Sequence, residues 1–238
     1  MSSLTFVLKG AMQSWGGSSR FLTRGTEQAP TKSGVIGLLA AAKGKRRTEP
    51  LTEFLNLKFG VRIDQPGRLI RDFQTAKPSA GEAMPLSYRY YLGDAVFLAG
   101  IESEDEEFLE SLAQSLAHPV FPLYLGRRSC PPILPLKTEI HSAGVLDSLK
   151  EHPWQAAQWH KKKVQQEKVK LEILLDAEPL TPGAETFRDE PLSFDPRRRE
   201  YGWRSVKSEQ VEVGNDCFVE PPGPSKFPES GHDPLAAF

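Results

Sequence analysis

The sequence predicts an α+β fold built around a ferredoxin-like domain. Hydrophobic patterns for strands and helices follow one another in the order strand, helix, strand, strand, helix, strand, which is the order of that fold. Between the second and third predicted strands lies a connection of 29 residues, from 65 to 93, where a minimal fold has a tight hairpin. After residue 142 a basic stretch and a further alternating strand follow. We therefore expect one main domain, an inserted arm and a smaller C-terminal β-rich extension.

The first strand–helix unit covers residues 4–44. Residues 4–9 (LTFVLK) have the composition of a short strand. In residues 31–44 the apolar side chains recur at helical spacing, with Thr31 or Ser33 as the N-cap and Gly44 as the stop.

The second half repeats this pattern from residue 57 onward. Residues 57–64 (LKFGVRID) alternate apolar and polar side chains, which predicts a strand with one buried face. Residues 94–101 predict the third strand, and residues 105–119 predict a helix whose acidic start suits the helix dipole. The fourth strand is expected within residues 133–140.

We divide the chain at two changes of composition. Residues 1–142 form the ferredoxin-like domain with its arm at about 65–93, and residues 143–213 form the extension. Residues 214–238 contain five prolines and few apolar residues able to form a core, so we expect a disordered tail.

The composition narrows the classes of function. The formal net charge is −1, so any site for a polyanion must be a local cluster of Lys and Arg. Cys130 and Cys217 have neither a CxxC neighbour nor a histidine at ligand spacing, so we expect no zinc site and no cofactor. No signal-peptide pattern or long apolar run is present, and we expect a cytoplasmic protein without membrane contact.

The stretch LYLGRRSCPP (residues 123–132) is the first candidate for anion binding. Gly126 lets the backbone approach a ligand closely, and Arg127 and Arg128 can each bind phosphate oxygens in a fork, with Ser129 beside them. The alternative is a surface turn with two solvated arginines.

The second candidate is the loop before the first predicted helix. Arg20, Arg24 and Lys32 flank a helix start, where free N–H groups favour an anion. Trp15 beside two glycines has the chemistry to stack on a base, but a buried core anchor explains it equally well.

The third candidate is the arm. Basic and aromatic residues are interleaved along it at strand spacing and would suit a hairpin placed against single-stranded RNA. The candidates on the arm are Arg71, Phe73, Gln74, Tyr88, Arg89, Tyr90 and Tyr91. Packing of an edge strand is the alternative for its tyrosines. A last arginine cluster at residues 196–204 is either a second phosphate contact, a protein-binding rim or a solvated charge run.

Catalytic motifs are absent from the sequence. It contains no GxSxG, P-loop or HExxH pattern. Metal-independent cleavage of RNA needs only a His, Lys or Tyr near the 2′-hydroxyl, so it leaves no signature and an endoribonuclease remains an alternative.

Three segments together resemble the CasD family, the RAMP-type subunit of the type I-E CRISPR surveillance complex (Cascade). They are GAMQSWG, PTKSGVIGLLAAAKG and LYLGRRSCPP, supported by RDFQTA and RDEPLSFDPRRREYGW. The matches occur in the same order over residues 4–206.

The resemblance implies a ferredoxin-like (RRM/RAMP-type) domain with a β-hairpin thumb, here the arm. It implies a non-catalytic subunit that binds the 5′ handle of the CRISPR RNA, caps a filament of CasC-like backbone subunits and contacts a CasA-like large subunit. The subunit would then contact target DNA only indirectly, through the complex. Related type I-C proteins cut the repeat, which keeps a metal-independent endoribonuclease as the alternative. The residues that we predict to bind RNA are Gln13, Trp15, Arg20, Arg24, Lys32, Ser33, Arg71, Phe73, Gln74, Arg89, Gly126, Arg127, Arg128 and Ser129.

Overall fold

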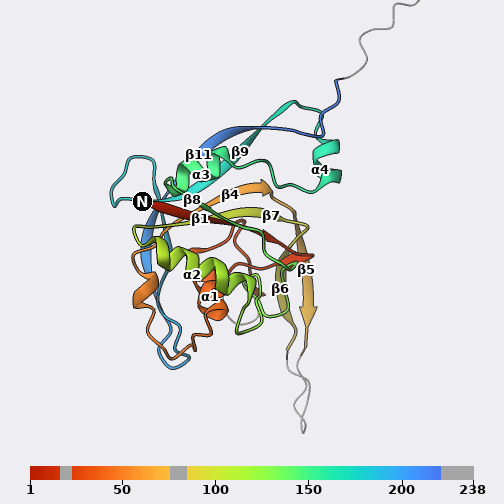
Figure 1. The fold of residues 1–238 in the computed structure, drawn as a ribbon. Helices are drawn as coiled ribbons and strands as arrows, with labels where there is room; N and C mark the ends of the chain where they lie inside the picture. Colours follow the sequence, from red (N-terminus) through yellow and green to blue (C-terminus); the bar gives the residue numbers. More distant parts are fainter. Residues whose placement is uncertain (17–22, 76–84, 221–238) are drawn as a thin grey trace, which may run out of the picture.

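A computed structural model describes residues 1–16, 23–75 and 85–220. Its centre is a seven-stranded sheet in the order β10-β11-β9-β4-β7-β1-β8, in which all neighbouring strands are antiparallel (Figure 1). The strands are β1 (Ser2–Lys9), β4 (Lys58–Gln65), β7 (Val96–Ser103), β8 (Thr138–His141), β9 (Lys168–Ala177), β10 (Glu185–Ser193) and β11 (Glu200–Gly214).

Helices α1 (Lys32–Ala42) and α2 (Glu106–Ala117) lie where the apolar spacing predicts them. The Thr31 hydroxyl accepts the N–H of Gly34, and the Asp105 carboxylate accepts that of Phe108, so both helices have a side-chain N-cap. Their apolar faces pack with one face of the sheet in the main core, which includes Phe6, Leu39 and Leu112. The short 3-10 helix η1 (Thr52–Phe54) follows α1.

The prediction that β4 has one solvent-facing side is wrong. Arg62 and Asp64, expected on the exposed face, are 0% and 1% exposed because α3 (Val145–Glu151) and the chain that follows it cover this side. Gly60 and Gly100 leave room for that helix, since a side chain at either position would overlap Val145 or Leu149. The sheet therefore has apolar packing on both faces.

The C-terminal strands continue the same sheet. β9 pairs with β4 over a short register around Val61↔Leu174, and β11 runs along the whole of β9. Helix α4 (Gln158–Lys163) precedes β9. The predicted tail begins at residue 214, but Gly214 is the last residue of β11. The next residue, Asn215, is buried, and its side-chain amide donates to the carbonyls of Lys161, Val164 and Gln166, so the ordered chain continues past the predicted boundary. The remainder of the predicted tail, residues 221–238, lies outside the described residues.

The predicted arm begins with β5 (Arg68–Gln74) and ends with β6 (Ser87–Gly93), which pair antiparallel from Arg68↔Gly93 to Gln74↔Ser87. This hairpin extends past the main sheet (Figure 1) and forms a second sheet with β2 (Met12–Gln13) and β3 (Thr23–Arg24). Residues 76–84 of the arm lie outside the described part. Within the described residues, no helix is long and apolar enough to cross a membrane.

Candidate nucleic-acid interface

Gln13 and Trp15 are core residues. Both side chains are 0% exposed, and the Trp15 Nε1 donates to Gln13 Oε1 at 3.1 Å. The Gln13 amide in turn donates to the carbonyl oxygens of Leu8 and Ala95. The structure therefore favours the core-anchor interpretation of Trp15, and neither side chain presents a group to RNA.

The start of helix α1 already holds an anion from the same chain. The backbone N–H of Lys32 donates to Asp189 Oδ2 at 2.8 Å, and the Lys32 ammonium lies 2.9 Å from Asp176 and 2.8 Å from Glu190. Arg204 completes this cluster by bridging Asp176 and Asp189 at 2.6 Å each. Lys32 is 5% exposed, so it fixes β10 to the helix rather than receives a phosphate, which corrects the prediction. The hydroxyl of the neighbouring Ser33 lies 3.5 Å from that of Thr31.

Arg204 stays positively charged within this buried cluster. Burial alone would lower the pKa of Arg204, but hydrogen bonds and charge attraction from Asp189, followed by Asp176, outweigh it and raise that pKa. The sequence carried no signal for the cluster, because Lys32 lies 144 residues before Asp176, the first of its partners in the chain.

The loop at residues 123–132 is tightly closed. Leu125 N–H donates to the Cys130 carbonyl at 2.7 Å, and Cys130 N–H donates to the Arg127 carbonyl at 2.9 Å. Cys130 itself is fully buried, and burial raises the pKa of its thiol. The glycine of this loop, Gly126, has φ +81° and faces the backbone of Ser14 rather than open solvent.

Replacing Gly126 with alanine is expected to lower the free energy of unfolding by roughly 1–3 kcal/mol. An alanine there keeps the positive φ and places a Cβ onto the Ser14 carbonyl oxygen. Gly183→Ala is the matched control, because Gly183 has φ +76° but no atom near the added Cβ. Urea unfolding of the two variants measures the difference; equal losses would show that the close approach to Ser14 has no energetic consequence.

Arg127 connects the loop to the base of the hairpin. Its guanidinium donates to the carbonyl oxygens of Tyr90, Arg24 and Gly25 at 3.2, 2.8 and 3.0 Å, and it lies 4.9 Å from the centre of the Tyr91 ring. Arg127 therefore positions β3 and β6, a role that the sequence did not reveal.

Arg128 has a different environment from its neighbour. Arg128 and Ser129 are both exposed, and the Arg128 guanidinium has no hydrogen-bond or ion-pair partner among the described residues. Of the two predicted phosphate-binding arginines, Arg128 is the one whose donors all face solvent.

One face of the hairpin carries exposed aromatic and basic side chains. Opposite residues of an antiparallel pair point to the same side, so the pairs Arg71↔Tyr90 and Phe73↔Tyr88 share one face with Leu69. We call these five residues the hairpin face. Phe73 is 66% exposed, and the Arg71 guanidinium lies 5.5 Å from the centre of the Tyr88 ring.

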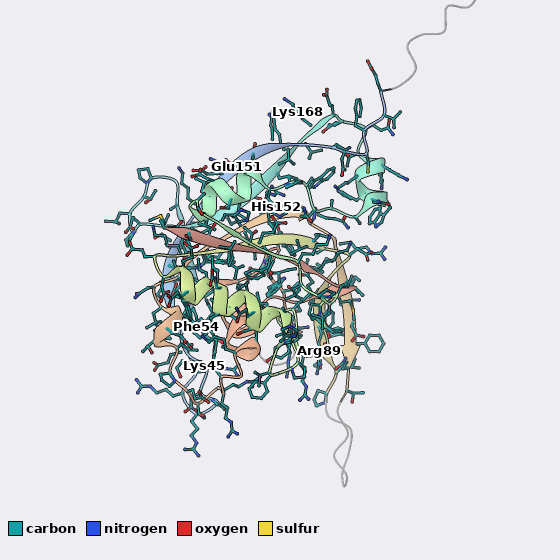
Figure 2. All side chains as sticks on the ribbon, viewed as in Figure 1. Lys45, Phe54, Arg89, Glu151, His152 and Lys168 are labelled. Atoms are coloured by element: carbon teal, nitrogen blue, oxygen red, sulfur yellow. The ribbon has the colours of Figure 1, made fainter. Side chains whose placement is uncertain are left out.

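The opposite side of the hairpin faces the body of the protein. Tyr91 is buried there, and Gln74 donates to Asp72 at 3.1 Å. Arg89 is on this side too (Figure 2), and its Nε is buried without an acceptor among the described residues. The predicted arm residues thus separate into Arg71 and Phe73 on the hairpin face and Gln74 and Arg89 behind it. Arg24 is exposed on the adjacent β3, and Arg20 lies outside the described residues.

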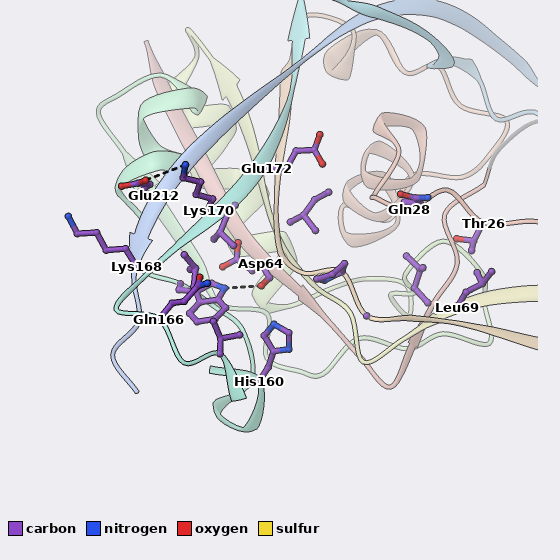
Figure 3. Close-up of a pocket in the computed structure, with 18 residues that line it drawn as sticks. Thr26, Gln28, Asp64, Leu69, His160, Gln166, Lys168, Lys170, Glu172 and Glu212 are labelled. Atoms are coloured by element: carbon purple, nitrogen blue, oxygen red, sulfur yellow. Dashed lines mark hydrogen bonds and ion pairs between the residues drawn. The ribbon is translucent and has the colours of Figure 1, made fainter. Parts of the chain in front are cut away.

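A cleft of about 860 Å³ adjoins the hairpin face (Figure 3). Leu69 of that face lines one side with Thr26, and Lys170 and Glu172 of β9 line the other. Lys170 lies 3.9 Å from Glu212, so the charges in the cleft are mixed and do not mark a phosphate site. Sequence reasoning missed this cleft, because it forms where β9 diverges from the end of β4.

Histidines are the groups that cleavage of RNA would use most readily. In the cleft, burial and then the charge of Lys163 lower the pKa of His160, which keeps it neutral at pH 7. His141 and Thr5 are 2.8 Å apart in a side-chain hydrogen bond, and His152 is 8% exposed beside Glu139. The described residues contain no group of three or more His, Cys, Asp or Glu able to hold a metal ion.

A family model described as CRISPR-associated protein (Cas_Cas5) matches residues 3–207. The chain belongs to the Cas5 family. This confirms the resemblance seen in the sequence motifs. The curated relative "CRISPR system Cascade subunit CasD" of Escherichia coli (strain K12) is 32% identical over 157 residues, which cover 57% of this chain and 69% of that protein.

Solved structures agree with the assignment of this Cas5 protein. A chain of a "CRISPR RNA-guided surveillance complex" superposes with a TM-score of 0.72 at 31% identity, covering 93% of this chain and 95% of that one. A chain titled "Crystal structure of Cas protein" gives a TM-score of 0.68 at 33% identity, covering 92% and 99%. The mixed α/β architecture with one large antiparallel sheet is thus shared with these structures.

Proposed function

We propose that this Cas5 protein is a non-catalytic subunit of a type I-E CRISPR surveillance complex, where it binds the 5′ handle of the CRISPR RNA. The observation that carries the proposal is the hairpin face, an exposed aromatic and basic surface that belongs to a chain of this family. Aromatic rings stack on unpaired bases of any identity, and arginine binds the adjoining phosphates. Arg128 supplies a further solvent-facing guanidinium on a rigid loop.

The arrangement of strands supports a ferredoxin-like RAMP domain as part of this proposal. Strands β4, β7, β1 and β8 are neighbours in that order, α1 connects β1 to β4, and α2 connects β7 to β8. In this account the hairpin within residues 65–93 is the thumb that covers the RNA. Residues 143–213 are the C-terminal extension, although their strands join the same sheet.

The partners follow from the same assignment. We propose that the subunit caps a filament of CasC-like backbone subunits, contacts a CasA-like large subunit in the cytoplasm, and meets target DNA only through the complex. Similarity to the Cascade subunit CasD and to a chain of a surveillance complex supports this placement.

Removing the outer side chains of the hairpin face tests the proposal. In the double variant Arg71→Ala with Phe73→Ala we expect affinity for handle-containing RNA to fall by at least about 50-fold, since stacking contributes about 1–3 kcal/mol per base and a charge-assisted hydrogen bond about 1.5–3 kcal/mol. Fluorescence anisotropy with labelled repeat RNA measures the change.

The matched control is another exposed arginine–aromatic pair. Arg188 lies 5.8 Å from the ring centre of Trp203, which is 67% exposed on β11, away from the hairpin. Arg188→Ala with Trp203→Ala removes the same chemistry and should leave RNA affinity unchanged. The proposal fails if the hairpin variant retains full affinity, or if both pairs lose affinity equally.

A further inference from the structure

Two arginine-rich loops lie toward the end of the molecule where α1 ends. One is residues 45–47, after the helix, and the other is residues 197–199, between β10 and β11. Strand β10 runs along α1 in the same direction: Lys32 pairs with Glu190 at 2.8 Å, and further on Gly37 faces the Phe194 ring.

Both segments turn soon after these contacts. Helix α1 ends at Ala42, five residues or about 8 Å beyond Gly37, and the Lys45 N–H donates back to the Ala40 carbonyl at 2.9 Å. Residues 195–198 form a turn in which the Arg198 N–H donates to the Asp195 carbonyl at 3.0 Å, so both loops stay near the end of α1. Figure 1 shows both connections at the lower end of the molecule, and in Figure 2 nitrogen-tipped side chains gather there around the labelled Lys45.

Several cations at this end are not neutralised. Lys45 pairs with Glu53, and Arg198 pairs with Glu200. The remaining guanidinium groups are exposed and have no carboxylate partner among the described residues; they belong to Arg46, Arg47, Arg197 and Arg199, which we call the arginine patch.

The patch adjoins the loop at residues 123–132. The Arg47 Nη2 lies 3.5 Å from the hydroxyl of Tyr124, two residues before Gly126. Of the apolar residues near the patch, Phe54 is 1% exposed and Phe194 packs against the main core, whereas Val120 beside Gly44 is 65% exposed.

We propose that the arginine patch binds the phosphodiester backbone of a nucleic acid segment other than the handle. Each guanidinium can bind two phosphate oxygens in a fork, and arginine on short turns reaches such oxygens without reading base edges. The patch shares no residue with the hairpin face, although it adjoins the loop that carries Arg128, so the inference goes beyond the proposed function.

The test uses the full-length chain with the triple variant Arg46→Gln, Arg197→Gln and Arg199→Gln. The probes are a single-stranded RNA without repeat sequence and a DNA duplex. We expect affinity at low salt to fall at least about 10-fold, and the slope of log affinity against log salt to decrease by about 0.7 per lost contact for the single strand or about 0.9 for the duplex. Anisotropy titrations at several salt concentrations give both quantities.

The matched control removes three exposed lysines elsewhere, in Lys137→Gln, Lys162→Gln and Lys163→Gln. A loss confined to the RNA probe identifies RNA as the ligand, and a loss that includes the duplex identifies DNA. Unchanged affinity and slope for both probes, or an equal fall in the lysine control, would overturn the proposal. The ratio of affinities for RNA with and without the handle distinguishes the two sites. The patch variant should retain this ratio, whereas the Arg71 and Phe73 variant should lose it.

Discussion

Replacing Arg62 with methionine is expected to lower the free energy of unfolding by about 3–5 kcal/mol, because the substitution leaves the buried carboxylate of Asp64 without its charge partner. Arg62 is 0% exposed, and its Nε and Nη2 bind the two oxygens of Asp64 at 2.7 and 2.9 Å. Its remaining donors reach the carbonyls of Leu149, His152 and Pro153 at 2.6–2.8 Å. All five N–H groups of the guanidinium therefore have acceptors, and these connect β4 to the end of α3.

A second variant separates the lost charge pair from the lost packing. Arg62→Met with Asp64→Leu removes both charges, so we expect it to recover part of the stability lost by Arg62→Met alone. Chemical denaturation followed by circular dichroism provides the free energies. A single-variant loss below about 0.5 kcal/mol, typical of surface substitutions, would contradict the role assigned to Arg62.

Arg204→Met is the second substitution with a large expected effect, again about 3–5 kcal/mol of lost stability. It would leave Asp189 with the Lys32 backbone N–H as its remaining hydrogen-bond donor and would deprive Asp176 of a 2.6 Å ion pair. Because this cluster fixes β10 against α1, hydrogen exchange should accelerate most in β10 and the first turn of α1.

The control for Arg204 is Arg198, an arginine on the surface that pairs with the carboxylate of Glu200. The Arg198 side chain is 81% exposed beside Glu200, and a solvent-exposed ion pair of this kind contributes little to stability. Arg198→Met should therefore leave the unfolding midpoint nearly unchanged. Similar midpoints for the two methionine variants would show that the buried cluster does not stabilise the fold.

Local patterns predicted the elements well. Apolar spacing, the N-cap candidates Thr31 and Ser33 and the acidic start at residues 105–107 located both main helices, because these signals lie within a few residues of each other. Alternation of basic and aromatic residues along the arm predicted a hairpin, which β5 and β6 form, but not which of its side chains share a face. The same alternation failed for β4, since its polar side is covered by a helix more than 80 residues later in the chain.

The candidate site was harder to predict because its details depend on distant residues. The anion at the start of α1 is Asp189, 157 residues from Lys32. Arg127 and Arg128 are adjacent in sequence, yet the carbonyls of Arg24 and Gly25 occupy one guanidinium while the other stays exposed. Residue type indicated a basic surface, and only the tertiary structure separated structural arginines from available ones.

Handle recognition is the central claim, and a gel-shift assay with end-labelled repeat RNA in EDTA tests it most directly. The full-length protein, alone and with a CasC-like backbone subunit, is mixed with RNA carrying either the native or a scrambled 5′ handle. We predict an intact, shifted band that requires the native handle. A discrete shorter RNA product would instead show a metal-independent endoribonuclease, and equal binding of both RNAs would contradict handle recognition.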